Sequence, residues 1–499
     1  MDAVQIPNHM KPATYWNNSG PFFGLKREMK RFSTMGVLFA SFVPGAAYAS
    51  DGSHLVGSQL SLLWGLPFVG MLLSIAIFPL VAPKFWEHHF GKIAAFWAAA
   101  LLAPCAFSFG LLVTATELLH TAALEYFPFI ILLFSLFVVA GGIQLVGNLV
   151  GNPTTNTALL GVGTVAASFI GTTGASMLLI RPLIRANQDR HRNRHVFVFF
   201  IFLVANIGGS LTPLGDPPLF IGFLKGVDFL WTMTAMLPPM AVASAVLLIL
   251  FYFVDRYHWR KECADWPTSL VPRQLRMEGL HNVLYLAGIL VAVLGSGLWK
   301  SGVQVPLGLG VAVSLEALVR DAALLVIGYL SWRTTPKTIR VENAFAWTPI
   351  QEVAFLFAGI FITIIPVLAI LRAAGDGALA PLLSLVTRPD NTPIIAAYFW
   401  LTGLLSSFLD NAPTYLVFFN VAGGNPQELM GPLSRTLLAI SAGAVFMGAN
   451  TYIGNAPNFM VKSICEERGI RMPSFFGYML WSGGILFPLF VVLTFIFFT

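Results

Sequence analysis

Two segments of this chain, 239 residues apart, carry the same helix-breaking pattern inside apolar sequence. The first reads GSLTPLGDPP (Gly209–Pro218) and the second reads GANTYIGNAP (Gly448–Pro457). Proline removes a backbone donor and clashes with the preceding turn, and glycine turns freely, so neither segment can be a regular helix. At the same shift, SFIGTTGAS (Ser168–Ser176) aligns with SFLDNAPTY (Ser407–Tyr415). Two motifs that share one offset indicate an internal repeat.

The sequence around these segments is too apolar for a soluble protein. Of the 499 residues, 56% are hydrophobic and only 10% are charged. Many apolar runs reach about 20 residues, which is the length that spans a bilayer as a helix. We therefore predict an all-α polytopic membrane protein, with the lipid bilayer as its surroundings. The net charge of +6 belongs to loops between apolar runs, so it indicates membrane orientation and no nucleic-acid partner.

Each half of the chain holds three full spans, an irregular apolar stretch, an interrupted span and a last span. If the irregular stretch is a re-entrant hairpin that crosses nothing, each half crosses five times and the second half is inverted, as in many secondary transporters. Lys and Arg concentrate in the loops that this topology places inside. The predicted organisation is a first repeat at 57–254, a cytoplasmic linker loop at 255–280 and a second repeat at 281–499. The first three spans are expected at Leu60–Val81, Ile93–Val113 and Phe127–Val150.

The segment 1–49 resembles a signal peptide. A basic stretch, KREMKR (Lys26–Arg31), precedes the short apolar stretch MGVLFASFVPG, and AAYA before Ser50 fits a small-residue cleavage site. An uncleaved short helix is the alternative. We expect a multi-pass protein of a bacterial-type inner (plasma) membrane.

An aspartate lies in the first break and an acid-amide pair lies at the second hairpin tip. A carboxylate at membrane depth costs about 2.5 to 3.5 kcal/mol on insertion scales, so Asp216 needs a partner or a function. The matching residue in the other half is Asn455. The second tip carries Asp410 and Asn411 where the first carries glycine and threonine. If the repeats fold together about a pseudo-two-fold axis, both acids converge on one cavity near the midplane, where a proton or a small cation would neutralise them.

The candidate residues fall into three groups. The expected cation- or proton-binding residues, which also include neutral oxygen donors, are Asp216, Asp410, Asn411, Asn455, Thr212 and Thr451. The expected hairpin-tip residues are Gly171, Thr172, Thr173, Gly174, Ser176, Ser407 and Pro413. The residues expected to break the helices are Gly209, Pro213, Gly215, Pro217, Pro218, Gly448, Gly454 and Pro457. The structural alternative is that each acid only caps the helix that follows it.

From about Leu60 to Phe498, the sequence resembles the ion transporter superfamily, above all its NhaD-type sodium/proton antiporters and their citrate-transporter-domain relatives. The resemblance rests on SSFLDNAPT (Ser406–Thr414), LTPLGDPP (Leu211–Pro218) and GANTYIGNAP. It implies ion binding at Asp410, Asn411 and Asp216, a homodimer, and an elevator movement of a transport domain against a scaffold. The first hairpin departs from the antiporters, because it reads GTTGAS where they carry an acid-amide pair.

Two transport functions follow. The favoured one is exchange of Na⁺ for H⁺, because no Arg or Lys lies near the hairpin tips or broken helices to neutralise a multivalent anion. The alternative is Na⁺- or H⁺-coupled transport of an organic anion such as citrate or a dicarboxylate, or export of an oxyanion. An enzyme is not expected, because no His-Glu-x-x-His or Gly-x-Ser-x-Gly motif occurs. No cofactor is expected, nor any metal beyond transported Na⁺, and the absence of a Walker motif argues against ATP drive.

Overall fold

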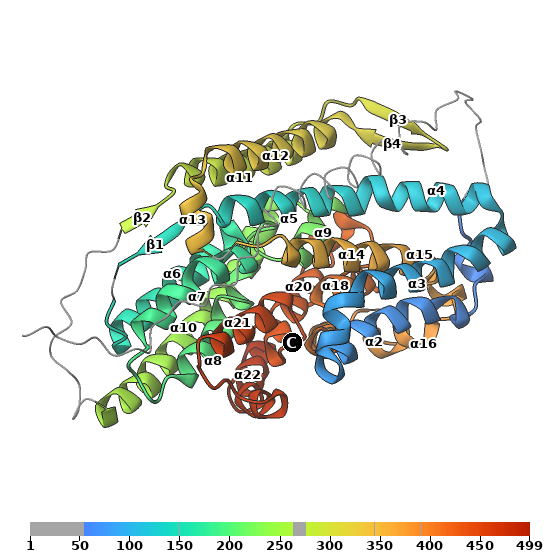
Figure 1. Cartoon of the computed structure of the whole chain (residues 1–499). Helices are drawn as coiled ribbons and strands as arrows, with labels where there is room; N and C mark the ends of the chain where they lie inside the picture. The colour runs from blue at the N-terminus through green and yellow to red at the C-terminus, as the bar shows by residue number, and fades with distance from the viewer. Residues whose placement is uncertain (1–53, 148, 263–275, 344, 391) are drawn as a thin grey trace, which may run out of the picture. The chain divides into compact units, whose positions relative to one another are not determined.

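The computed structural model describes residues 54–147, 149–262, 276–343, 345–390 and 392–499, and Figure 1 shows their arrangement. The expected signal segment lies outside these residues. The fold is all-α and polytopic, as predicted. Two short antiparallel pairs of strands are its only sheets in the described ranges: β1 (Gln144–Val146) with β2 (Arg276–Glu278), and β3 (Gln304–Gly308) with β4 (Val311–Ser314).

Among the described residues, six helices are long and apolar enough to cross a membrane. They are η2 with α2 (Leu62–Val81), α3 (Pro83–Phe109), α4–η3–α5 (Leu111–Ala140), α10 (Phe229–Glu262), α11 (His281–Leu298) and α22 (Phe475–Phe497). The pair α14 (Thr348–Thr363) and α15 (Ile365–Arg372), bent by 41° between the two helices, is a seventh candidate span if it is counted as one. These spans expose apolar side chains such as Phe107, Leu284 and Leu298, as expected for helices that face lipid.

The helix α12 (Leu315–Thr334) has the length of a span but carries four charged residues, Glu316, Arg320, Asp321 and Arg333. Its Arg320 is buried and pairs with Asp321, Nε to Oδ1 at 2.8 Å. Short elements complete the connections: η1 (Gly57–Gln59), α13 (Lys337–Glu342), η6 (Ala374–Asp376), α16 (Ala380–Val386) and α19 (Pro426–Met430).

Two of the predicted spans were placed wrongly along the chain. The second span begins ten residues before the expected Ile93, at Pro83. The third occupies Leu111–Ala140, and β1 lies where that span was expected to end. The polar residues of α4 (Leu111–Thr121) and of the π-helical turn η3 (Ala122–Tyr126) interrupt the apolar pattern. Glu125 in that turn is tolerated because it is buried against Lys225, with which it forms an ion pair.

The irregular stretches are helical hairpins, as predicted. The first consists of α6 (Pro153–Ile170) and α7 (Thr172–Ala186), and the second of α17 (Ile395–Phe408) and α18 (Asn411–Val421). The interrupted spans are broken helices, also as predicted. The first consists of α8 (Arg194–Leu203), η4 (Ile207–Ser210) and α9 (Pro217–Leu224). The second consists of α20 (Ser434–Met447), η7 (Gly448–Asn450) and α21 (Ala456–Glu467).

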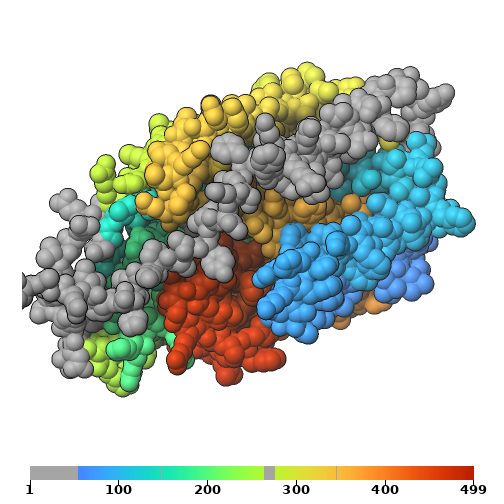
Figure 2. Space-filling model, in the orientation of Figure 1, coloured from blue at the N-terminus to red at the C-terminus, as the bar shows by residue number. Residues whose placement is uncertain are grey.

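The most deeply buried helices of the described chain belong to the hairpins and the broken helices. Every residue of α18 is buried, and so is every residue of α8 after its first, which is the pattern of helices that are packed on all sides. Contacts run from α6 to η4, from α9 to α18 and from α17 to α20, whereas α5 packs on α12 and α3 on α14. On the face shown in Figure 2, the last elements of the chain (red) occupy the surface between the first spans (blue) and the green region.

The predicted linker begins later than expected, because α10 continues to Glu262. Asp255 is fully buried in this extension, and its Oδ1 lies 2.6 Å from Arg190 Nη2 and 2.7 Å from His195 Nε2. The buried ionic cluster thus ties α10 to the base of the first hairpin and to the start of α8. Of the remaining linker residues, 263–275 lie outside the described part of the chain, and β2 follows them.

Candidate functional site

The first hairpin turns at a single residue between two helices. Gly171 has φ +78°, a left-handed conformation that favours glycine. The next residue, Thr172, is buried, and its backbone N–H donates to the carbonyl of Gly215 in the first break at 2.9 Å. A Cβ on Gly174 would lie 2.9 Å from that of Ala140 in α5. The hairpin tip is therefore packed between the first break and α5.

The first break is held by its own glycines and one threonine. The hydroxyl of Thr212 donates to the carbonyl of Ser168 in α6 and accepts from the backbone N–H of Leu214 at 3.1 Å. A Cβ on Gly215 would lie 2.1 Å from the carbonyl oxygen of Gly209, so glycine is required where the two ends of the break meet. Pro217 and Pro218 start α9, where proline's missing donor costs nothing. Pro213 lies inside the break and is part of no helix.

The second break repeats this arrangement. The hydroxyl of Thr451 donates to the carbonyl of Ser407 in α17 at 2.5 Å and accepts from the N–H of Ile453 at 3.2 Å. A Cβ on Gly454 would lie 2.6 Å from the carbonyl oxygen of Gly448. Pro457 lies in the first turn of α21, and Pro413 lies in the first turn of α18. The expected breaking residues of both halves thus lie in the breaks or in the first turns of the helices that follow.

Four discontinuous elements meet at Asp216, which is 2% exposed. Its Oδ1 accepts from Thr172 Oγ1 of the first hairpin tip at 3.1 Å and from Asn455 Nδ2 of the second break at 3.2 Å. Its Oδ2 accepts from Asn411 Nδ2 of the second tip. The contact between Asp216 and Asn455 joins two residues that the 239-residue shift relates. A contact between equivalent positions is what a pseudo-two-fold axis through the site would produce.

The structural alternative for Asp216 is not observed. Asp216 occupies the N-cap position of α9 in extended conformation, but its side chain makes no capping hydrogen bond. The carboxylate is directed to side chains of three other elements. No Lys, Arg or His in the described part of the chain forms a hydrogen bond or an ion pair with it, so its partners are neutral donors.

Asp410 differs from Asp216 in both burial and role. It is half-buried, and its Oδ1 accepts from the N–H of Ala412 at 3.1 Å, so it caps α18 as the structural alternative proposed. It precedes Asn411, whose Nδ2 donates to Asp216. The two acids are thus neighbours at the junction, but Asn411, and not Asp410, contacts the buried carboxylate.

The other described tip residues form no hydrogen bond with the Asp216 carboxylate. Ser407 donates to the carbonyls of Gly403 at 2.8 Å and Met447 at 3.1 Å, and Asn450 Nδ2 donates to its hydroxyl at 2.9 Å. Ser176 is buried about one turn along α7, and no described residue hydrogen-bonds its hydroxyl. Thr173 is half-buried in the first turn of α7.

Two asparagines of the junction were not anticipated from the sequence. Asn206, at the end of the first half-helix, and Asn458, in the first turn of α21, are both fully buried and share a hydrogen bond of 2.7 Å. A signal was available, since an amide inside an apolar run needs a partner. Only their position relative to each other, which the sequence does not give, reveals that they are partners.

The chemistry of the site is that of one carboxylate and several neutral oxygens. The described residues contain no group of three or more His, Cys, Asp or Glu that could hold a metal ion. Asn411 Oδ1 is buried, and no described residue donates to it. One acid with neutral oxygen donors suits a proton or a hard monovalent cation better than a multivalent metal.

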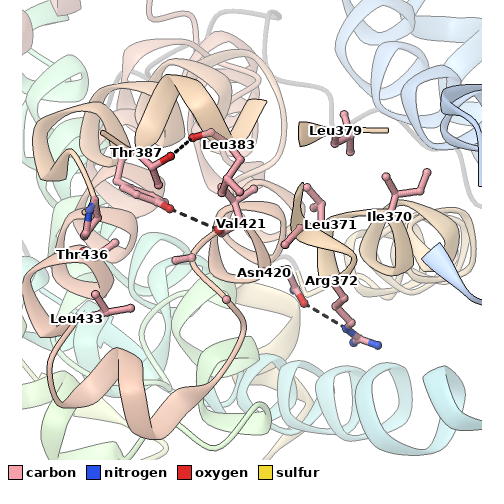
Figure 3. Close-up of a pocket in the computed structure, with 15 residues that line it drawn as sticks. Ile370, Leu371, Arg372, Leu379, Leu383, Thr387, Asn420, Val421, Leu433 and Thr436 are labelled. Carbon is pink, nitrogen blue, oxygen red and sulfur yellow. Dashed lines mark hydrogen bonds between the residues drawn. The ribbon is translucent and has the colours of Figure 1, made fainter. Parts of the chain in front are cut away.

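A separate cavity of about 300 Å³ lies at the other end of the second hairpin. Figure 3 shows Arg372 of α15 at its edge, where its Nε donates to Asn420 Oδ1 at 3.4 Å. Leu383 of α16 lines the cavity together with Leu379, the residue before α16. Thr436 of α20 lines it as well. Its lining includes none of the candidate site residues, so it does not reach Asp216.

Comparison with known proteins gives one family. No curated protein matches the sequence. A family described as "Putative citrate transport" matches residues 57–498, which is nearly the whole chain and includes both hairpins and both breaks. This agrees with the resemblance found in the motifs of the second hairpin and the two breaks. The chain therefore belongs to this citrate-transport family of multi-pass membrane proteins, a family of secondary transporters.

Proposed function

We propose that the protein exchanges Na⁺ for H⁺ by alternating access at Asp216, in a bacterial-type inner membrane. The observation that carries the proposal is a buried carboxylate whose hydrogen-bond partners, among the residues that the structure describes, are all neutral side chains of the two hairpins and the second break. A charge at this depth is costly unless it is neutralised. A single H⁺ or a single Na⁺ neutralises it, and the two cannot bind together, so each expels the other.

The unpaired oxygen of Asn411 supports a cation as one of the two occupants. An amide oxygen buried without a donor costs about 1 to 3 kcal/mol, so such groups need a reason. A Na⁺ ion between this oxygen and Asp216 would supply one. Asp410, half-buried beside Asn411, is placed to attract cations to the junction.

Coupled transport of a citrate-like anion is the second candidate, and two observations favour it. The first is the family description. The second is that α7, α9, α18 and α21 all begin at the junction, where their N-terminal partial charges would stabilise an anion. In this case, Asp216 would bind only the coupling cation.

Purified protein in liposomes with a preset pH gradient tests the proposal. A pH dye would report the response to NaCl, KCl or sodium citrate in wild type and in Asp216→Asn. We expect NaCl to collapse the gradient in wild type and no response in Asp216→Asn. Accumulation of labelled citrate, with no response to NaCl alone, would overturn exchange and establish the second candidate.

A further inference from the structure

A chain of three buried asparagines leads from the backbone of the second break to Asp216. Its members are Asn458 in α21, Asn206 at the end of the first half-helix and Asn455 in the second break. Their exposed fractions are 0%, 0% and 3%. The carbonyl groups around them fix which way each amide faces.

The orientation is set first at Asn458. Its Nδ2 donates to two backbone carbonyls, those of Gly448 at 2.8 Å and Thr451 at 2.9 Å. Its Oδ1 therefore faces Asn206, whose Nδ2 donates to it at 2.7 Å and to the carbonyl of Ile201 at 2.8 Å. Reversing either amide would place oxygen against oxygen or nitrogen against nitrogen.

The orientation of the Asn206 amide in turn determines that of Asn455. Because Asn206 uses its nitrogen for Asn458, only its Oδ1 is left for Asn455 Nδ2, which lies 3.3 Å away. The same nitrogen faces the carbonyl of Ala205 at 3.2 Å and Asp216 Oδ1 at 3.2 Å. With three acceptors around it, the amide of Asn455 cannot turn its oxygen toward Asp216 without facing three oxygen atoms.

The other amide at Asp216 has no such restraint. Asn411 Nδ2 donates to Asp216 Oδ2, and the Oδ1 of Asn411 has no partner among the described residues. Rotating this amide breaks only its one hydrogen bond to the carboxylate, which a bound cation would break in any case. An amide can bind a cation only through its oxygen.

We propose that Asn206 is a positioning residue that holds Asn455 as a permanent donor to Asp216, so that Asn411 alone turns its oxygen to the transported cation. The inference rests on the proposed function, since it assigns roles within the same site. The permanent donor competes with the cation for the carboxylate, which keeps binding weak enough for release on the other side.

The chain of amides has no counterpart under the 239-residue shift. The 239-residue shift relates Asn206 to Val445 and Asn458 to Leu219, and neither partner can form hydrogen bonds through its side chain. Val445 is fully buried, as Asn206 is. It therefore offers a matched control position for packing effects.

The test measures the Na⁺ concentration for half-maximal proton flux, in liposomes at alkaline pH where protons compete least. We expect Asn411→Leu to raise this concentration at least tenfold. Asn455→Leu removes the competing donor, and Asn206→Leu removes the acceptor that keeps Asn455 oriented as a donor, so each variant should lower this concentration several-fold. In an Asn455→Leu background, Asn206→Leu should add nothing.

Several results would overturn the inference. Equal increases in Asn411→Leu and Asn455→Leu would make both amides cation ligands. Additive effects of Asn206→Leu and Asn455→Leu, or an equal effect of the control Val445→Leu, would make the role of Asn206 one of packing. Asn206→Ala replaces Asn206→Leu if the latter does not fold, with the same expectations. A wild type without Na⁺-dependent flux overturns the proposed function and this inference together, whereas a responding wild type with unchanged Asn206 variants overturns the inference alone.

Discussion

In the first broken helix, the hydroxyl of Thr212 donates to the carbonyl of Ser168, and in the second, that of Thr451 donates to the carbonyl of Ser407. Each pair is the image of the other under the 239-residue shift. The glycine contacts across the two breaks correspond in the same way. The backbone of the two halves is thus held by one set of interactions, used twice.

The side chains that face the junction are not repeated. The first half supplies Asp216, and the second supplies Asn455 at the related position. The first tip has a glycine, Gly171, where the second has Asp410, and Thr172 corresponds to Asn411. A repeated backbone lets the two halves meet at one junction, whereas an asymmetric set of side chains places one buried carboxylate among neutral donors. The backbone interactions of the two halves are therefore alike, whereas their side chains at the junction differ.

The largest effect is expected from moving the acid across the axis. If the halves were interchangeable, the double variant Asp216→Asn/Asn455→Asp would transport like wild type. We expect it to keep less than about a hundredth of wild-type flux, because an acid at position 455 would face Asn206 Oδ1 and the carbonyl of Ala205. Dye-reported proton flux in liposomes measures this. A flux above about a tenth of the wild-type flux would show that the acid works equally well from either half of the chain.

An intermediate effect is expected from the glycines that close the breaks. Gly215→Ala puts a Cβ 2.1 Å from the carbonyl oxygen of Gly209, and Gly454→Ala puts one 2.6 Å from that of Gly448. We expect the first to lower the free energy of unfolding by about 3 kcal/mol and the second by about 1 to 2 kcal/mol, as for overpacked cores. Thermal melting in detergent measures the order. The control is Gly484→Ala in α22, where the added Cβ meets nothing within 4 Å. If both breaks tolerate alanine as well as Gly484 does, the glycines do not close them.

The sequence was sufficient to predict what depends on the repeat. Gly and Pro in both halves identified the hairpins and the breaks, because these residues act locally on the backbone and need no knowledge of the packing. The repeat also related Asp216 to Asn455, and Thr172 to Asn411, before any contact was known.

What depends on partners could not be predicted in the same way. The span at Leu111–Ala140 was displaced because Glu125 interrupts its apolar pattern, and its partner Lys225 lies 100 residues away. The two acids were treated alike, yet one is enclosed by neutral donors and the other caps α18. Asn206 and Asn458 are identified as partners only once the folded chain brings them together. Each of these features depends on a contact that only the folded chain forms. The local sequence pattern gives no information about such contacts.

The smallest effect is expected where the halves are most alike. Thr212→Val and Thr451→Val each remove a hydroxyl that bridges a hairpin carbonyl and a backbone N–H. We expect each to lower the free energy of unfolding by about 1 kcal/mol, and the two values to agree within about 0.5 kcal/mol. Melting in detergent, together with the Na⁺ concentration for half-maximal flux, checks this. Equal destabilisation without a change in that concentration would mean that both threonines only stabilise the backbone and do not bind the cation. A rise in that concentration for only one of them would instead make that hydroxyl a cation ligand, and would extend the asymmetry of the side chains into the breaks themselves.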